Sequence, residues 1–416
     1  MPKKSIILIT LLMPFLLIIL FRNQIVLTID AWQHRVSKNM PKRPLPELPA
    51  ELKKALLEYL QTHFQNPEEY IINKFKDHDI VFLGEFHRIR HDPELVQHIV
   101  PLLYRHGIYN LGMEFACRRD QALIDSLVTA PDYDQSVTNR ILADFIATWG
   151  YQDYADIFKA VWQLNRSLPD SVRKFRLVGL NAFNNWSLVK TEADRRDPKI
   201  LAKVHAEGYG DSVMAETVLR EIVAKKEKAL IYCGLHHAFT QYHQPMYDAQ
   251  KDSIVDFFQD RLGLRVFKAI GRRAFTISLH APWNDPKYEK FVYPLNGAID
   301  ALMKEIGDRF YPVGFDTRNT PFGELTDTAS IYQVGYPDFK LADFCDGYIF
   351  QKPISQYRTV TPIPGFINKH NVDWIRAHLS NPRLKNTIWW KILSPETMGH
   401  LQCSHVSIEK WFSDFQ

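Results

Sequence analysis

The sequence predicts an α/β fold with a central, mainly parallel β-sheet flanked by helices in three layers. Two short apolar runs, residues 80–83 and 229–233, support this prediction. Apolar runs that stop at a glycine are typical of parallel strands covered on both faces. Each run leads into Gly-x-x-His, at residues 84–87 and 234–237. Stretches with helical spacing separate the strands, as in βαβ units.

Composition places the chain among ordinary globular proteins. Of its 416 residues, 46% are hydrophobic and 24% are charged, and the net charge of +4 comes from interspersed charges of both signs. No basic tract is dense enough to predict a nucleic-acid partner. The length would allow two or three domains, although α/β domains of about 250 residues are common. No pattern predicts an oligomeric state.

The four cysteines do not form a metal-binding pattern. Cys117, Cys233, Cys345 and Cys403 include no Cys-x-x-Cys pair, which argues against a structural zinc site. Secretion would permit two disulfides, but the spacing resembles no disulfide framework. We expect buried free thiols, because free cysteine is among the residue types most often buried.

The first 24 residues predict a signal anchor. Lys3 and Lys4 precede an uncharged run over residues 5–21, which is short for a spanning helix and long for a signal-peptide core. No small-x-small cleavage site follows, so we expect an uncleaved anchor, with a cleaved signal as the alternative. Positive charges after the run favour a cytoplasmic location for the rest of the chain. A short basic tail before a large domain instead favours translocation, and we expect the domain on the periplasmic face of an inner membrane.

The rest of the chain divides into three parts. Residues 25–50 include four prolines between residues 40 and 50, which predict a stiff, extended spacer. An α/β domain is expected over residues 51–355, and residues 356–416 are expected to form an extension that packs on it.

Within the α/β domain each element follows from a local pattern. A packing helix is expected over residues 51–64, and Asp92-Pro93-Glu94 predicts a helix with Asp92 as its N-cap. Strands are expected at 80–83, 109–114, 175–180, 229–233, 311–315 and 347–350. Helical stretches are expected at 120–168 and 207–226. Residues 267–279 predict a further strand or a hairpin.

Polar side chains at the ends of these strands define the candidate site. Glu85 and His87 follow the first strand, Glu114 ends the second, and His237 follows the fourth. Ligands of open α/β sheets bind beyond the carboxyl ends of the strands, so these four side chains are expected to lie together.

Two kinds of chemistry suit this set. His87, Glu114 and His237 are donor types that bind a divalent metal ion such as zinc, manganese or cobalt, which would ionise a bound water. Without a metal, a carboxylate would orient His87 as a general base and the second histidine would protonate the leaving group.

Secondary candidates surround the site, and each has a structural alternative. His236 could replace His237, Asn181 could bind a substrate carbonyl or cap a turn, and His91 could share a helix face with the site. Arg88 could bind an anionic group, as could Arg90, or either could be a surface charge. Tyr232 and Tyr242 could ligate haem iron, although core packing is their commoner role.

Several motifs are missing from the sequence. It has no Gly-x-Ser-x-Gly, no P-loop and no Gly-x-Gly-x-x-Gly after a strand. These absences argue against serine hydrolases, nucleotide hydrolases and dinucleotide-binding enzymes.

In their order and spacing, the two Gly-x-x-His motifs and Glu114 resemble the superfamily of the ChaN haem-binding lipoproteins, the Tiki proteases and the erythromycin esterases. Residues around Trp149, Tyr154, 178–182 and 211–216 are also similar to ChaN-like members, so the resemblance covers about residues 75–270. It implies an α/β fold with a pocket at the strand ends. His87, Glu114 and His237 fall in the functional positions, with Glu85 beside them.

The resemblance implies more than one activity. Tiki-like members are described as metal-dependent proteases, esterase members use the first histidine and the acid to activate water, and ChaN-like members bind haem. The chain departs from ChaN in its anchor, which has no lipidation cysteine, and in its C-terminal extension. We therefore expect a membrane-anchored hydrolase acting on an ester or peptide bond of a small-molecule or peptide substrate. A haem-binding protein without catalysis is the alternative, and an inactive envelope scaffold is a third possibility.

Overall fold

A seven-stranded sheet runs through the computed structural model, which describes residues 42–248, 251–404 and 407–416. The strand order is β10-β11-β7-β1-β4-β2-β3, and every neighbouring pair is parallel except β10 with β11. The predicted α/β class with a mainly parallel central sheet is confirmed. The strands are β1 (Ile80–Glu85), β2 (Asn110–Cys117), β3 (Arg176–Asn181), β4 (Ala229–Gly234), β5 (Pro245–Asp248), β6 (Ser253–Phe257), β7 (Ala274–Leu279), β8 (Trp283–Asn284), β9 (Phe291–Val292), β10 (Val313–Asp316) and β11 (Gly347–Phe350).

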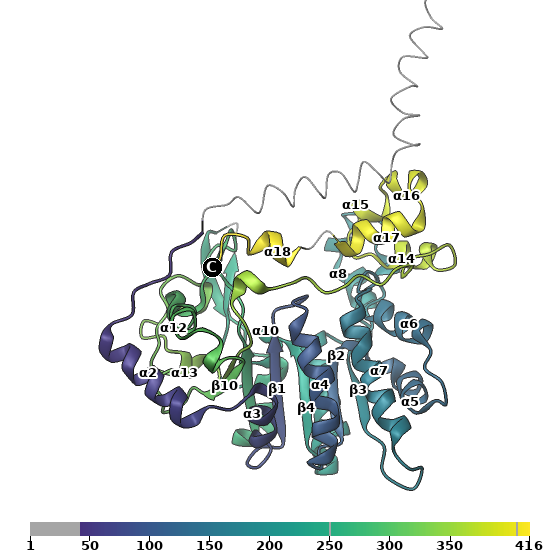
Figure 1. Ribbon diagram of the computed structural model, residues 1–416. Helices are drawn as coiled ribbons and strands as arrows, with labels where there is room; N and C mark the ends of the chain where they lie inside the picture. Colours follow the sequence, from purple (N-terminus) through teal and green to yellow (C-terminus); the bar gives the residue numbers. More distant parts are fainter. Residues whose placement is uncertain (1–41, 249–250, 405–406) are drawn as a thin grey trace, which may run out of the picture.

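Helices cover both faces of the sheet (Figure 1). Successive side chains of a strand point to opposite faces. In β1, Val81 and Leu83 accordingly pack in the core shared with α4 and α7, and Ile80 and Phe82 pack in the core shared with α9 and α11. The helices are α2 (Ala50–His63), α3 (Pro67–Lys74), α4 (His91–Arg105), α5 (Gln121–Thr129), α6 (Gln135–Phe145), α7 (Gln152–Ser167), α8 (Pro198–Val204), α9 (Gly210–Glu221), α10 (Leu235–Ala238), α11 (Leu262–Ile270), α12 (Ala298–Ile306), α13 (Leu341–Phe344), α14 (Val372–His378), α15 (Pro382–Lys385), α16 (Trp389–Ile392), α17 (Pro395–Ser404) and α18 (Ile408–Trp411).

Strand order brings the two Gly-x-x-His motifs side by side. β1 lies between β4 and β7, and its register with β4 pairs Glu85 with Gly234. β2 is the next strand beyond β4, with Met113 opposite Tyr232. The carboxyl ends of β1, β4 and β2 are therefore adjacent, although these strands are far apart in the sequence.

Gly84 near the end of β1 and Gly234 at the end of β4 each allow a close approach. A Cβ on Gly84 would lie 2.9 Å from Leu235 Cδ1 and 3.0 Å from Leu235 Cα, so the glycine lets α10 pack directly on β1. A Cβ on Gly234 would lie 2.7 Å from His87 Cε1. The glycine of the second motif therefore makes room for the histidine of the first.

The C-terminal part of the chain crosses the carboxyl ends of the strands (yellow-green to yellow in Figure 1). Isolated β-bridges join Thr359 to Ile89 and Pro362 to Tyr151. Beyond these bridges, Ile408, Phe412 and Phe415 pack in a small core with Ile89. The extension therefore closes over the same edge of the sheet at which the candidate residues lie.

Two local expectations are wrong. α4 begins at His91 after Arg90, whose side chain makes no capping bond, and Asp92 lies inside the helix, where it accepts a hydrogen bond from Gln351 Nε2 at 2.8 Å. Residues 267–279 are neither one strand nor a hairpin. The apolar face of α11 continues to Ile270, Gly271 ends the helix at a φ of 59°, and β7 begins only at Ala274.

The Pro-rich segment also differs from an isolated spacer. Residues 42–49 are extended, but Arg43 forms an ion pair with Asp414 and its guanidinium lies 4.6 Å from the Phe415 ring centroid. The start of the described chain is therefore attached to its end.

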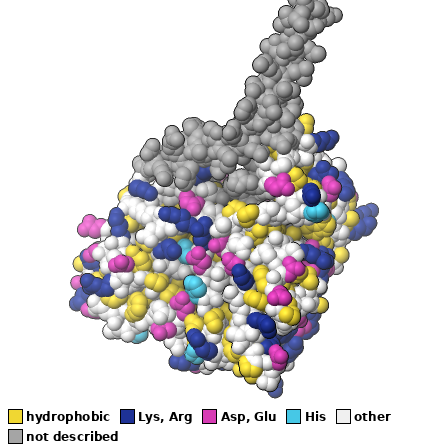
Figure 2. Space-filling model, turned by 45° about the vertical axis from the view of Figure 1, so that its right-hand side comes forward, with side chains coloured by type: hydrophobic (Ala, Val, Ile, Leu, Met, Phe, Trp, Pro, Cys, Tyr) yellow, Lys and Arg dark blue, Asp and Glu magenta, His cyan; other side chains and the backbone are white. Residues whose placement is uncertain are grey.

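Other predictions concern the surface and the cysteines. Cys117, Cys233 and Cys345 are buried free thiols, whereas the side chain of Cys403 is not among those described. Figure 2 shows acidic and basic side chains interspersed over the face in view, without a tract of one sign. The predicted anchor over residues 1–24 lies outside the described residues. Within the described part of the chain, no helix has the length and apolar character needed to span a bilayer.

Candidate active site

The carboxylate of Glu85 is the buried centre of the candidate site. Glu85 ends β1 and is only 2% exposed. Its Oε1 accepts a hydrogen bond from Tyr154 at 2.6 Å, and its Oε2 accepts one from Tyr232. Burial, and then the charge of Glu85, raise the pKa of both tyrosines well above the ordinary value, so both remain protonated and donate.

His87 is oriented by this carboxylate. Its Nδ1 lies 2.8 Å from Glu85 Oε1. Because Glu85 accepts from every partner, the proton of the neutral His87 ring resides on Nδ1 and the lone pair is on Nε2. Edge-to-face contacts with Phe115 and Trp149, at 5.5 and 5.4 Å between ring centroids, hold the ring in place. His87 is therefore arranged as a base that accepts a proton at Nε2.

Glu114 meets His87 beside Gly234. Glu114 Oε2 accepts a hydrogen bond from the Gly234 backbone N–H at 2.7 Å. A Cβ on Gly234 would lie 3.1 Å from His87 Nε2 and 3.5 Å from Glu114 Oε2. The base nitrogen and the carboxylate thus converge at the point where β4 ends.

His237 bridges two carboxylates. Its Nε2 lies 3.4 Å from Glu114 Oε1, and its Nδ1 lies 2.6 Å from Asp211 Oδ1. Burial opposes the charged form of the ring, but the carboxylates of Glu114 and Asp211 outweigh it and raise the pKa of His237 above 6.5. The protonated ring can donate a proton.

The donor types around Glu114 suit a divalent metal ion, but their placement does not. The second nitrogens of His87 and His237 each face a carboxylate, as is common for metal-bound histidines. Within residues 42–248, 251–404 and 407–416, however, no three or more His, Cys, Asp or Glu side chains converge closely enough to hold a metal ion. Proton transfer at this site is therefore assigned to the side chains themselves.

Two cavities meet at these residues. The larger, of about 680 Å³, is lined by Glu114 and by polar and aromatic side chains from the β2 and β3 ends and from α14 and α15. The smaller, of about 300 Å³, is lined by His87, His237 and mostly apolar side chains. Arg88 lines both cavities. The candidate residues therefore lie between two spaces of different character.

The secondary candidates differ in whether they line one of the two cavities. His236 lines the smaller cavity, where Nε2 lies 2.7 Å from Tyr332 Oη, and burial lowers the pKa of His236 to about 3. Asn181 lines the larger cavity. His91 lines neither of these cavities and is buried beside Asp92 and the Tyr357 ring. His236 is therefore a neutral wall residue, and His91 lies away from the reactive groups.

The two arginines after His87 differ in their partners. Arg90 Nε donates to the Thr359 carbonyl at 3.1 Å and lies 3.8 Å from Asp153 Oδ1. The Arg88 guanidinium instead lies over the Trp149 ring, with 4.9 Å between Cζ and the centroid. Arg88, unlike Arg90, is turned toward the candidate site.

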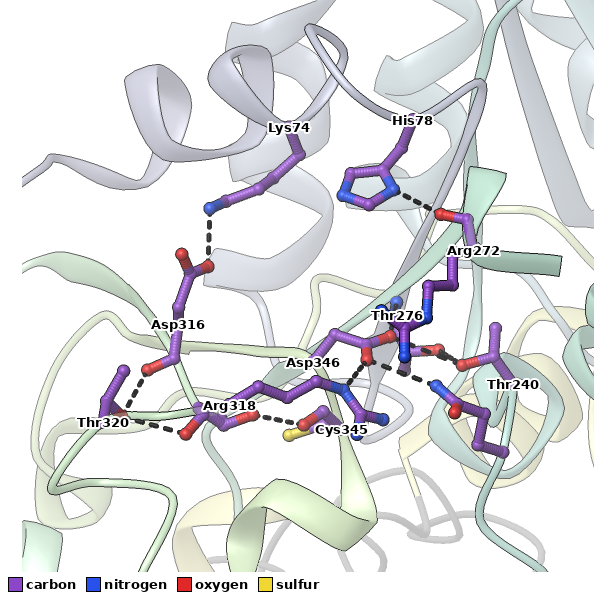
Figure 3. Close-up of polar contacts among 12 residues, drawn as sticks. Lys74, His78, Thr240, Arg272, Thr276, Asp316, Arg318, Thr320, Cys345 and Asp346 are labelled. Atoms are coloured by element: carbon purple, nitrogen blue, oxygen red, sulfur yellow. Dashed lines mark hydrogen bonds and ion pairs between the residues drawn. The ribbon is translucent and has the colours of Figure 1, made fainter.

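A second group of polar residues, shown in Figure 3, has a structural role. Asp346 Oδ2 accepts from the Thr276 N–H at 2.9 Å, and Oδ1 accepts from Arg318 Nε at 2.5 Å. Asp316 at the end of β10 pairs with Lys74. These carboxylates are satisfied by neighbouring donors and tie the β10–β11–β7 side of the sheet together.

Sequence patterns did not identify three members of the site. Asp211 lies in the first turn of α9, Tyr154 lies on α7, and Tyr232 lies within β4. Tyr232 lies within an apolar run and Tyr154 within a helical stretch, and nothing in the sequence shows that their hydroxyls face a carboxylate. The similarity over residues 211–216 was the only available signal for Asp211.

Comparison with known proteins agrees with the sequence resemblance. Residues 71–186 match the protein family described as "Haem-binding uptake, Tiki superfamily, ChaN". No curated protein matches the chain. Solved structures similar to it include a succinoglycan biosynthesis protein, with 10% identity, a TM-score of 0.47 and coverage of 73% of this chain and 98% of that chain.

Two further solved structures are similar to the chain. One is an erythromycin esterase mutant in its open conformation, with 11% identity, a TM-score of 0.42 and coverage of 72% of this chain and 95% of that one. The other is ChaN of Campylobacter jejuni, with 14% identity, a TM-score of 0.31 and coverage of 52% and 87%. The family match over residues 71–186 confirms the ChaN and Tiki superfamily resemblance that the sequence predicts.

Proposed function

We propose that the protein is a hydrolase that cleaves an ester or amide bond with water. The observation that carries this proposal is the arrangement of His87, whose Nδ1 is held by Glu85 at 2.8 Å while Nε2 and the Glu114 carboxylate both lie beside Gly234. A histidine with one nitrogen held by a carboxylate and the other free is the arrangement that general-base catalysis requires.

The side chains supply each proton transfer. A water between His87 and Glu114 gives a proton to His87 Nε2 as its oxygen attacks the substrate carbonyl carbon. When the tetrahedral intermediate collapses, His237 gives a proton to the leaving alcohol or amine. His87 then releases its proton to solvent and His237 regains one, so hydrolysis consumes one water and yields an acid and an alcohol or amine.

Substitution of the base tests this proposal. We expect His87→Ala and Glu114→Gln to lower kcat for 4-nitrophenyl acetate or a fluorogenic peptide mixture by about 10²- to 10⁴-fold, because general acid–base catalysis contributes that much. His98→Ala is the matched control, since His98 is exposed on α4. Full turnover by both site variants, with unchanged circular dichroism spectra, would overturn the proposal.

Haem binding is the second candidate, because the matched family is described as haem-binding. Tyr232 and Tyr242 do not suit a haem iron, since both are buried and their hydroxyls donate to Glu85 and to the Tyr332 carbonyl. His378 suits it better. It lines the larger cavity with its Nδ1 bonded to the Trp374 carbonyl at 2.8 Å, and Nε2 has no partner among the described residues.

Absorbance distinguishes the two functions. A haem-binding protein would develop a Soret band with haemin that His378→Ala removes, whereas a hydrolase without haem would show no such band. Metal content measured on the same sample of purified protein would show whether an ion accompanies the protein.

The proposed attachment to a membrane rests on residues 5–21 of the sequence. Fractionation of cells that express the full chain, or a chain lacking residues 1–24, tests it. Recovery of both chains in the same fraction would contradict it.

A further inference from the structure

We propose that Arg88 binds an anionic group of the substrate, a carboxylate or a phosphate, in the larger cavity next to the reacting bond. This inference rests on the proposed hydrolase function and specifies its substrate class. The observations that support it are the missing counter-charge of Arg88, its fixed position, and the donors that line the same cavity.

Arg88 is a cation without a counter-ion. The acids that share the larger cavity both have cationic partners. Glu114 lies 3.4 Å from His237, and Asp144 lies 3.0 Å from Arg119. Among the described residues, no carboxylate pairs with Arg88, and its Nε is sealed from solvent without an acceptor. The Arg88 charge is therefore not neutralised by an ion pair within the described residues.

The backbone and two aromatic rings hold Arg88 in place. Its φ is 74°, in the left-handed region that non-glycine residues rarely adopt. The Arg88 N–H donates to Tyr154 Oη at 3.0 Å, and the Arg88 carbonyl accepts from the Val360 N–H at 3.1 Å. Its Cζ lies 4.9 Å from the Trp149 ring centroid and 5.6 Å from that of Tyr151. Strained backbone of this kind clusters at ligand-binding sites.

Stacking on the rings leaves the edge of the guanidinium for a ligand. The Arg88 Cζ lies near the Trp149 and Tyr151 rings, and a guanidinium carries N–H groups in the fork that matches a carboxylate or phosphate. Tyr154 links this position to catalysis, because the same hydroxyl that holds the Arg88 N–H donates to Glu85.

Three asparagines add neutral donors to the larger cavity. The side-chain oxygens of these residues are already engaged, by the Ala182 N–H for Asn181, by His205 for Asn184 and by the Arg383 N–H for Asn381. Their orientation is therefore fixed, and the NH₂ groups of Asn181, Asn184 and Asn381 have no acceptor among the described residues. A cavity with one unpaired cation and several free N–H donors suits a ligand rich in acceptor oxygens.

The smaller cavity shares Arg88 with the larger one and has more aromatic surface. Trp283, Tyr332, Trp411 and Phe86 contribute aromatic surface to it, together with Leu235. The inferred substrate thus joins an apolar or aromatic part in the smaller cavity to an anionic part in the larger one, and the bond to be cleaved lies between them.

A matched pair of esters tests the inference on the full chain. Mono-4-nitrophenyl adipate carries a free carboxylate, and its methyl ester is the same molecule without the charge. We expect kcat/KM to favour the charged ester, and Arg88→Met to reduce this preference about tenfold to a hundredfold, the range expected for a charge-assisted hydrogen bond. Arg88→Lys should retain part of the preference. Arg90→Met is the control and should keep the wild-type preference.

Binding measured by calorimetry separates this inference from the proposed function. We expect adipate or inorganic phosphate to bind to the wild-type protein and to bind at least tenfold more weakly to Arg88→Met. The tighter of the two ligands identifies a carboxylate or a phosphate as the preferred group. Binding of either anion without hydrolysis of any ester would contradict the hydrolase but support the anion site. If the protein hydrolyses both esters with equal kcat/KM and binds neither anion, the inferred anion site is wrong, whereas the proposed hydrolase function is supported.

Discussion

His237 Nδ1 lies 2.6 Å from Asp211 Oδ1, which joins the histidine after β4 to the first turn of α9. Asp211 also accepts from the Leu262 N–H at 2.8 Å and pairs with Arg261 at 3.2 Å. Although burial opposes it, these donors lower the pKa of Asp211, so the carboxylate is charged and favours the imidazolium form of His237. This pair leads to two predictions about pH.

Asp211→Asn is expected to narrow the pH range of activity. If protonated His237 donates to the leaving group, activity falls as pH rises through the pKa of His237. Loss of the Asp211 charge lowers that pKa, so the alkaline limb of the kcat profile should move to lower pH. Measurement of kcat against pH for the wild type and the variant checks this prediction, together with an NMR titration of His237. An unmoved alkaline limb would show that His237 is not the acid.

The same pair should make stability depend on pH. The pKa of His237 is raised in the folded state, so its contribution is complete below the unfolded value of 6.5 and is lost as pH rises through the folded pKa. The pKa of Asp211 is lowered, so its contribution is present above 3.8 and is lost as pH falls through the folded pKa. Urea unfolding should therefore show the largest difference between wild type and Asp211→Asn at about pH 4 to 6.5. If the difference in free energy of unfolding between wild type and Asp211→Asn stays constant as the pH rises above 6.5, the interaction of Asp211 with protonated His237 is contradicted.

Tyr232→Phe should reduce activity while the protein remains folded. The Tyr232 hydroxyl donates to Glu85, and its loss leaves a buried carboxylate with one donor fewer. Hydrogen bonds to charged groups contribute about 1.5–3 kcal/mol, and we expect the free energy of unfolding to fall within that range. Activity should fall because the base is less firmly oriented. Tyr242→Phe is the control, since its hydroxyl donates to a neutral carbonyl away from Glu85.

Gly234→Ala should displace the base. The added Cβ would lie 2.7 Å from His87 Cε1, closer than such atoms approach, so the ring must move away from Gly234. We expect a loss of kcat of about 10²-fold or more, the scale of a misplaced catalytic group, with a smaller loss of stability. Thermal unfolding and kinetics on one preparation separate the two effects. Wild-type kcat in a folded variant would show that His87 need not occupy this position.

Phe412→Ala should test the closure by the C-terminal segment. Phe412 is 3% exposed and its ring centroid lies 5.7 Å from that of Phe86, which lines the smaller cavity. Truncation of a buried phenylalanine costs about 3–5 kcal/mol, so unfolding should occur at a clearly lower urea concentration. Trp411→Ala is the comparison. Trp411 is 39% exposed, so its truncation should lower the free energy of unfolding by less. Equal losses for both would indicate that α18 is not anchored through Phe412.

Much of the fold is encoded locally. Apolar runs that end in glycine predicted β1 and β4, and Gly347–Phe350 was predicted with its observed bounds as β11. The errors arose where local patterns are ambiguous. Phe267, Ala269 and Ile270 form a short apolar pattern that suits a strand or a helix equally, and the choice depends on packing of α11 against α9. Asp92 has the side chain of an N-cap, but Gln351 from a distant segment binds it instead.

Local patterns in the sequence place Glu85, His87 and His237 at strand ends, because an apolar run and its glycine stop lie in consecutive residues. Glu114 was also predicted to end its strand, but β2 continues to Cys117 and Glu114 lies inside it. Only the tertiary structure decided what these side chains face. The sheet order places β4 between β1 and β2, α9 brings Asp211 to His237, and α14 and α15 enclose the larger cavity. These contacts join residues that are distant in the sequence, 26 apart for Asp211 and His237 and 120 apart for Gly234 and Glu114, and no local pattern specifies them.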